Sequence, residues 1–187
     1  YHFARLGFNA YRIHIWDVEI TDEQGNLIAN DHLDLLDYLI AKLQERNIYT
    51  LITAQTNFGN GYPQRNQKTS GYSYLYDKCE IHSNPKAIEA QERYLKALVN
   101  HVNPYNKLRY KDDPMVIGFE INNEPCHTGT PAMTRQYIER MLKTLKEAGN
   151  RKPVFYNVSH NLSHVESYYS SKIQGTTYQW YPTGLVG

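Results

Sequence analysis

The chain has 187 residues, a formal net charge of +1, and acidic and basic side chains mixed along its length. This balance excludes the basic stripe of a nucleic-acid-binding protein and the polybasic segment of a membrane anchor. No apolar run of about 18 residues occurs, so no membrane span is expected. We therefore expect one domain whose partners are neither nucleic acid nor a lipid bilayer.

Strand-like and helix-like segments alternate along the whole chain. The strand segments are rich in β-branched and aromatic residues, and the helix segments carry apolar residues at helical spacing. Asn30 or Asp31 is suited to cap the first long helix. Pro85 is suited to open the second, and Gly149 to end the third. In chain order we predict a strand at 8–15, a helix at 31–43, a strand at 48–53, a helix at 85–101, a strand at 115–121, a helix at 131–148, a strand at 153–158, a short helix after 163 and a strand at 173–178.

This alternation predicts an α/β fold with parallel strands joined by right-handed crossovers. An open doubly wound sheet and a closed (β/α)8 barrel both satisfy it. No GxGxxG or GxxxxGK[ST] run follows a strand, which weakens the nucleotide-binding open sheet, and no GxSxG elbow supports an α/β hydrolase. Residues 57–84 form a long polar and aromatic loop, which is either functional or a variable decoration.

The run from Gly118 to Pro125 holds two carboxylates of interest, Glu120 and Glu124. Side chains two and four positions apart share a face of a strand, so Glu120, Asn122 and Glu124 point the same way if the strand continues. Because Pro125 has no amide hydrogen to donate, regular pairing ends there. Glu124 is therefore predicted at the C-terminal tip of a strand, and in a barrel that rim is where catalytic groups gather.

The segment Ile121-Asn122-Asn123-Glu124-Pro125 resembles the Asn-Glu-Pro motif that ends the fourth strand of clan A glycoside hydrolases. These are (β/α)8 retaining enzymes that include the family 5 cellulases and mannanases. Residues 7–13 resemble the second-strand segment in which an arginine lies beneath the catalytic site. Residues 179–182 resemble the sixth-strand segment that usually carries a His-x-Tyr pair, and residues 112–114 resemble the usual lead-in to the fourth strand. The resemblance covers nearly the whole chain, from the second to the sixth strand.

The resemblance implies a TIM barrel and a role for each matching residue. Glu124 would protonate the leaving glycosidic oxygen and then deprotonate the incoming water, which needs a pKa raised by partial desolvation and a second carboxylate. Asn123 would hydrogen-bond the sugar 2-hydroxyl. Arg12 and Tyr181 would hold the nucleophilic carboxylate, and Trp180 would stack on a sugar ring.

The chain also departs from the family pattern. The family places its nucleophile at the end of the seventh strand, so we expect that residue outside this chain. Gln179 stands where histidine is usual, and Thr56-Asn57 stands where a His-Asn pair is common, so substrate contacts are expected to differ from those of typical cellulases. Because a complete barrel has about 250 residues, residues 1–187 are expected to be a single catalytic-barrel domain in partial form.

Several residues have a plain structural reading beside a functional one. His14, two positions from Arg12, either lines the site or is a satisfied core histidine. Glu120 is expected to be a structural group inside the barrel, paired with a base or hydrogen-bonded. His160 and His164 are four apart, but no HExxH pattern accompanies them, and no metal is expected.

The two cysteines, Cys79 and Cys126, lie far apart and make no CxxC or other metal-ligand pattern. We expect no disulfide framework from them, and they do not indicate whether the protein works in an oxidising or a reducing compartment. Asn157 and Asn161 each begin a glycosylation acceptor pattern. Asn157 lies on a predicted buried strand, and we discount both patterns.

Together these observations predict a hydrolase that needs no cofactor and cleaves a β-linked poly- or oligosaccharide by a retaining double displacement. Transglycosylation would use the same site and differ only in whether water or a sugar attacks. The alternative from another class is a carbohydrate-binding barrel that has lost catalysis, which would keep Asn123 and the aromatic residues. Because polysaccharide substrates usually lie outside the cell, we expect an extracellular or periplasmic location.

Overall fold

The computed structural model describes residues 2–15, 17–56, 71–76, 78–127, 129–158 and 164–178. Strands and helices alternate along these residues. In chain order they are α1 (His2–Arg5), β1 (Ala10–His14), α2 (Asp17–Ile20), α3 (Asp31–Gln44), β2 (Tyr49–Thr53), the 3-10 helix η1 (Tyr72–Leu75), α4 (Pro85–Asn100), β3 (Val116–Glu120), α5 (Pro131–Glu147), β4 (Val154–Asn157), α6 (Val165–Ser170) and β5 (Gly175–Thr177).

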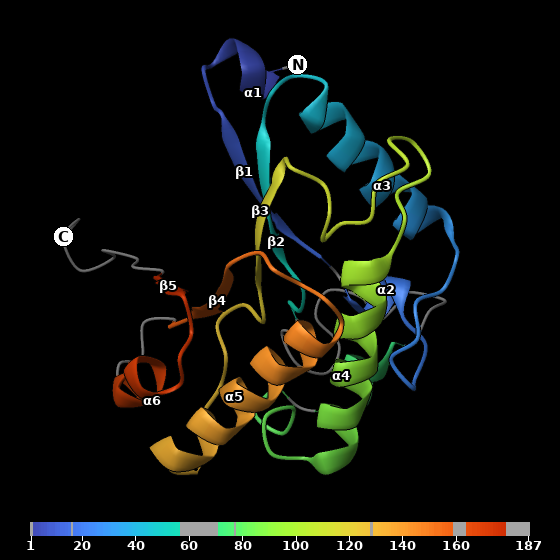
Figure 1. Ribbon diagram of the computed structural model, residues 1–187. Helices are drawn as coiled ribbons and strands as arrows, with labels where there is room; N and C mark the ends of the chain where they lie inside the picture. The colour runs from blue at the N-terminus through green and yellow to red at the C-terminus, as the bar shows by residue number, and fades with distance from the viewer. Residues whose placement is uncertain are drawn as a thin grey trace, which may run out of the picture.

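The strands form one five-stranded parallel sheet whose spatial order is the same as their sequence order, β1-β2-β3-β4-β5. When every right-handed crossover steps in the same direction, all connecting helices fall on one face of the sheet. Figure 1 shows α3, α4, α5 and α6 on one side of the strands. A doubly wound sheet would reverse its strand order and carry helices on both faces, so the topology is that of consecutive units of a (β/α)8 barrel.

The hydrophobic core lies between the sheet and these helices. Alternate strand residues such as Ile13, Ile52, Phe119 and Tyr156 are buried in it, against apolar residues of α3, α4 and α5. The other face of the sheet carries Arg12, Thr53, Glu120, Asn157 and Thr177, whose side chains contact one another. Since successive strand residues point to opposite faces, one face makes the core and the other carries a polar cluster.

Local sequence signals set the ends of the long helices. Asn30 caps α3, because its side-chain oxygen accepts a hydrogen bond from Leu33 N at 3.0 Å. Pro85 opens α4 with Asn84 as its cap. Gly149 follows α5 at a φ of 82°, the left-handed conformation that ends many helices. Among the described helices, none has the length and apolarity to cross a membrane.

The observed strands and long helices lie within one or two residues of the predicted ranges. The short elements α1, α2 and η1 were not predicted. In the described part of the 57–84 segment, Tyr72 and Ser73 of η1 are fully buried. The Tyr72 ring packs on Tyr94 of α4 with a centroid separation of 5.8 Å, so this part of the segment belongs to the core.

Candidate active site

A buried carboxylate at the end of β3, Glu120, organises the polar face of the sheet. It is 0% exposed. On one oxygen it accepts hydrogen bonds from Arg12, whose Nε lies 2.9 Å away, and from the Thr53 hydroxyl. On the other it accepts from the Thr177 hydroxyl and from Asn157 Nδ2 at 3.4 Å. Residues from four other positions on the sheet thus converge on one anion, as the predicted structural role of Glu120 requires.

Arg12 connects this anion to the rim of the site. Its Nη2 donates to Asn123 Oδ1 at 2.9 Å, and its Nη1 contacts His14 Nε2. Burial and the Arg12 charge lower the pKa of His14, while Glu120 and Glu124 act in the opposite direction. The neutral imidazole therefore accepts from the guanidinium through Nε2. His14 is partly exposed at the end of β1, beside Arg12.

Glu124 lies beyond the C-terminal tip of β3, where the chain leaves the sheet. Its φ is 44°, a conformation that favours glycine and that is unusual before a proline such as Pro125. Such backbone strain costs about 1–3 kcal/mol and persists where neighbouring structure fixes it. Here Asn123 N donates to Gln55 O at 2.8 Å, and Glu124 N donates to Asn157 Oδ1 at 3.2 Å. Hydrogen bonds to the two neighbouring strand ends therefore fix the backbone at Glu124.

Glu120, Asn122 and Glu124 were expected to share one face if the strand continued, and that condition is not met. The strand ends at Glu120, and the Asn122 side chain turns to the helix side, where its Nδ2 donates to His82 Nε2 at 2.9 Å and contacts Tyr137 OH at 3.4 Å. Asn123 joins Glu120 instead, through Arg12. The strand period no longer holds once the backbone leaves regular pairing.

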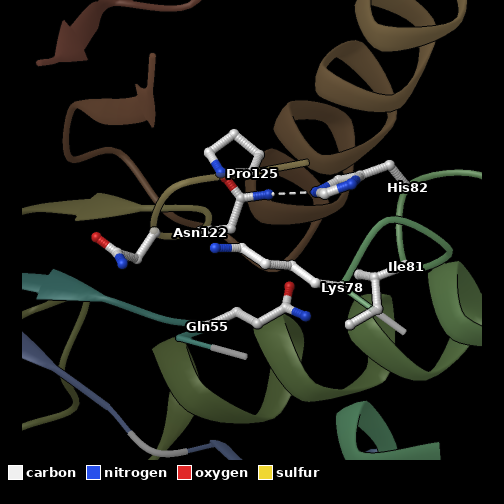
Figure 2. Close-up of a pocket in the computed structure, with 7 residues that line it drawn as sticks. Gln55, Lys78, Ile81, His82, Asn122 and Pro125 are labelled. Atoms are coloured by element: carbon white, nitrogen blue, oxygen red, sulfur yellow. Dashed lines mark hydrogen bonds between the residues drawn. The ribbon is translucent and has the colours of Figure 1, made fainter. Parts of the chain in front are cut away.

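A small pocket adjoins this rim on the helix side. Figure 2 shows Lys78 extending into it between Asn122 and Gln55. Burial lowers the pKa of Lys78, and the negative charge of Glu124 opposes that shift, so the two groups interact electrostatically. The pocket is lined by Gln55, Lys78, Ile81, His82, Asn122, Asn123 and Pro125.

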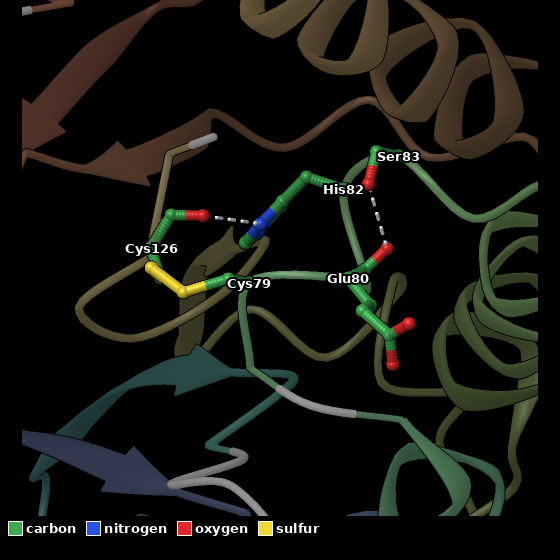
Figure 3. Close-up of a disulfide and its surroundings, with 5 residues drawn as sticks. All are labelled: Cys79, Glu80, His82, Ser83 and Cys126. Atoms are coloured by element: carbon green, nitrogen blue, oxygen red, sulfur yellow. Dashed lines mark hydrogen bonds between the residues drawn. A yellow bond between two sulfur atoms is a disulfide. The ribbon is translucent and has the colours of Figure 1, made fainter. Parts of the chain in front are cut away.

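A disulfide joins Cys79 to Cys126, across 47 positions of sequence, with a Cα–Cα distance of 4.7 Å. The expectation that these cysteines form no disulfide framework is therefore wrong, since folding brings the turn before α4 against the segment after Glu124. Figure 3 shows the bond beside His82, whose Nδ1 donates to Cys126 O at 3.0 Å. The segment two residues beyond Glu124 is tied to this turn by a covalent bond and a hydrogen bond.

Histidines on the helix side of the rim are kept neutral. Burial, with His127 nearby, lowers the pKa of His82 to about 3, and burial with His164 nearby lowers that of His127 to about 4. His127 bonds Tyr156 OH at 2.9 Å and stacks on His164 at a centroid distance of 4.9 Å. His164 in turn bonds Thr134. In the described ranges, no group of three or more His, Cys, Asp and Glu side chains is arranged to hold a metal ion.

A second buried carboxylate, Asp17 of α2, supports the adjacent rim. It accepts hydrogen bonds from Thr56 N at 3.1 Å and from the Ser73 hydroxyl, which ties η1 to the chain beyond β2. Burial raises the pKa of Asp17 to about 6. Its bonds are all to neighbouring protein groups, so we assign it a structural role.

The structure brings most of the predicted site residues together. Asn123, Arg12 and His14 form one contact network, and Glu124 follows directly after it. Trp180 and Tyr181 lie outside the described residues, as do Gln179, Asn57 and His160. The sequence analysis did not identify Thr53, Asn157 and Thr177 as partners of Glu120. The sequence signal that could have found them is that each is a polar residue near the C-terminal end of a predicted strand. The glycosylation reading of Asn157 was rightly discounted, since its side chain is 0% exposed.

The fold and this site together define a (β/α)8-type protein with a carboxylate at the C-terminal rim of its strands. Residues 1–184 match the family described as Cellulase (glycosyl hydrolase family 5), and the chain belongs to that family.

Known relatives match part of the chain, and solved structures share its fold. The chain is 32% identical over 102 residues to mannan endo-1,4-beta-mannosidase 3 of Arabidopsis thaliana, a match that covers 52% of this chain and 24% of the relative. It is similar in structure to the endo-1,4-beta-mannanase from Rhizomucor miehei, with a TM-score of 0.74, 19% identity, and coverage of 97% of this chain and 61% of that one. A family 5 mannosidase from the same organism gives a TM-score of 0.71 at 16% identity, with 98% and 50% coverage. The chain thus spans about a quarter of that plant relative and half or more of these solved chains.

Proposed function

We propose that the complete protein is a retaining glycoside hydrolase that cleaves a β-linked mannan, with Glu124 as its acid/base. The observation that carries this proposal is the strained glutamate at the rim, held from both sides at the tip of β3. Strained backbone of this kind collects at active sites, where the surrounding structure fixes it. The similarity to a mannan endo-1,4-beta-mannosidase and to an endo-1,4-beta-mannanase supports the choice of mannan.

The chemistry needs two carboxyl groups about 5–5.5 Å apart in a retaining enzyme. Glu124 would protonate the glycosidic oxygen as the bond breaks and then take a proton from the attacking water. Glu120 is a poor candidate for the second group, because its oxygens already accept from Arg12 and from several neutral donors. As the family resemblance implies, we propose that the nucleophile lies outside this chain and that residues 1–187 form part of one barrel domain.

The neighbours of Glu124 would bind substrate and hold the nucleophile. Asn123 uses its amide oxygen on Arg12, so its amide nitrogen is the group that would donate to the sugar 2-hydroxyl, a contact that strengthens in the transition state. Arg12 would stabilise the negative charge of the nucleophilic carboxylate, and the neutral His14 would lie beside it. Tyr181 would assist them, and Trp180 would stack on a sugar ring.

We also propose that the complete protein works outside the reducing cytosol, in an extracellular or periplasmic location. The Cys79–Cys126 disulfide supports this, because such bonds persist in oxidising compartments.

The experiment that tests the function is hydrolysis of β-1,4-mannan, β-glucan and xylan by the complete protein and its Glu124→Gln variant. A Glu89→Gln variant is the matched control, since Glu89 is an exposed glutamate of α4. We expect mannan cleavage by the wild type and the control, and a loss of about 10²–10⁴-fold in Glu124→Gln. A wild-type protein that binds mannan without cleaving it would instead indicate a carbohydrate-binding barrel.

A further inference from the structure

Asn157, the last residue of β4, contacts both the buried anion and the backbone of the proposed acid/base. Its Oδ1 accepts from Glu124 N at 3.2 Å, and its Nδ2 donates to Thr177 Oγ1 at 2.9 Å and to Glu120 Oε1 at 3.4 Å. The side chain is 0% exposed. No sequence motif or family resemblance pointed to this residue as part of the site.

The partners of Asn157 determine how its amide is oriented. A backbone N–H can only donate, so the group that faces Glu124 N must be the amide oxygen. A carboxylate that accepts from Arg12 can only accept, so the group that faces Glu120 must be the amide nitrogen. Thr177 fits the same orientation, because its hydroxyl donates to Glu120 and accepts from Asn157. A rotated amide would break both contacts at once.

This amide replaces regular sheet pairing at the point where the chain turns. Ile121 N still donates to Phe155 O of β4, as in a parallel ladder. Continuing that ladder would pair Asn123 N with β4, but Asn123 N donates to Gln55 O on the other side. The next amide, that of Glu124, is then held by the Asn157 side chain. Since Pro125 has no N–H, the following peptide offers no donor to hold the glutamate.

We propose that Asn157 is a positioning residue for Glu124, which fixes the left-handed backbone that aims its carboxyl group at the leaving oxygen. The inference rests on the proposed glycosidase function. Asn157 does not touch substrate, and its effect is transmitted through the Glu124 amide. General acid catalysis requires the proton donor within hydrogen-bond reach of its target, so loss of this contact reduces protonation of the leaving group more than any other step.

The test compares two substrates with the same β-mannosyl group and different leaving groups. A 2,4-dinitrophenol group leaves as a stable anion and needs little protonation, whereas the sugar hydroxyl of a mannooligosaccharide needs a general acid. We expect Asn157→Ala to lower kcat/KM about 10²-fold on the oligosaccharide, and less than tenfold on the dinitrophenyl mannoside. Asn157→Ser, whose hydroxyl is too short to reach all these partners, provides a second variant with a polar group if the alanine variant does not fold.

The matched control is Thr53→Val, which removes a different hydrogen bond to Glu120 and leaves the Asn157–Glu124 contact in place. If Asn157 acts only through Glu120, Asn157→Ala and Thr53→Val should each lose activity equally on the two substrates. That result would overturn the inference. Asn157→Asp keeps an acceptor for Glu124 N, so we expect it to restore the wild-type ratio of the two substrates even where its overall rate is lower. A ratio as low as that of Asn157→Ala would contradict the proposed contact.

The same experiment separates the two proposals. If the wild-type protein cleaves neither substrate, or if Glu124→Ala keeps the wild-type ratio, the proposed function itself fails. If Glu124→Ala loses the oligosaccharide selectively and the folded Asn157 variants do not, only the inference about Asn157 fails.

Discussion

The Cys79–Cys126 disulfide offers a perturbation whose size follows directly from the structure. The bond spans 47 positions of sequence. Loop-closure entropy for a loop of that length is worth about 4 kcal/mol at 25 °C. In domains of about 150–250 residues each kcal/mol shifts Tm by about 2–4 °C, with the smaller shift in the larger domains. Because a complete barrel has about 250 residues, the double variant Cys79→Ala/Cys126→Ala should melt about 8 °C below the wild type.

The catalytic geometry should survive this change better than the stability does. The hydrogen bond from His82 to Cys126 O remains in the variant, as does the contact of Glu124 N with Asn157. Because the disulfide acts mainly on the unfolded chain, turnover measured well below Tm should stay near the wild-type value.

The assay is thermal and denaturant unfolding of the complete protein, with and without a reducing agent. Reductant should lower the Tm of the wild type to that of the double variant and should leave the double variant unchanged. Titration of two free thiols in the oxidised, native wild type would refute the reasoning, as would equal melting temperatures for the two proteins.

Three further changes test the buried polar groups. Burial raises the pKa of Asp17 from 3.8 to about 6, so between these pH values the folded protein keeps a proton that the unfolded chain loses. The free energy of unfolding should therefore fall as the pH rises from about 4 to 6. Asp17→Asn should remove this pH dependence from unfolding curves. The pKa of His82 is lowered to about 3, which has the opposite effect. Below pH 6.5 the His82 imidazole takes up a proton in the unfolded chain but not in the folded protein, so the free energy of unfolding falls as the pH falls, by about 2 kcal/mol at pH 5. His82→Gln should flatten that decline, and an unchanged slope would contradict it. Glu120→Ala leaves the Arg12 charge without its buried partner and should cost about 3 kcal/mol of unfolding free energy; a cost below about 1 kcal/mol would mean that solvent replaces the carboxylate.

The strands and long helices were predictable because their signals are local. Asn30 and Gly149 mark helix ends through the chemistry of single residues, and the structure places both as predicted. The alternation of strands and helices then leaves few ways to connect the chain. Short elements such as η1 carry no periodic signal, and the burial of Tyr72 depends on contacts with α4 that local sequence does not specify.

The site was predictable where a motif coincides with a strand end and not elsewhere. Glu124 was placed at the strand tip because Pro125 marks the end of strand pairing, and the resemblance to the Asn-Glu-Pro motif pointed to Asn123 and to the role of Glu124. Asn122 was misplaced because the backbone leaves the strand before that residue, which the alternation rule cannot anticipate. The disulfide depends on a contact between segments 47 positions apart, and sequence spacing alone gives no measure of that distance.

The central claim is that Glu124 is the acid/base of a retaining glycosidase, and azide rescue tests it most directly. The complete protein and its Glu124→Ala variant would be assayed on an aryl β-mannoside with and without azide, and the configuration of any mannosyl azide determined by NMR. We predict that the variant loses mannan hydrolysis and that azide accelerates it on the aryl substrate, with β-mannosyl azide as the product. Hydrolysis of mannan at the wild-type rate by the variant, or formation of the α-azide, would contradict the claim.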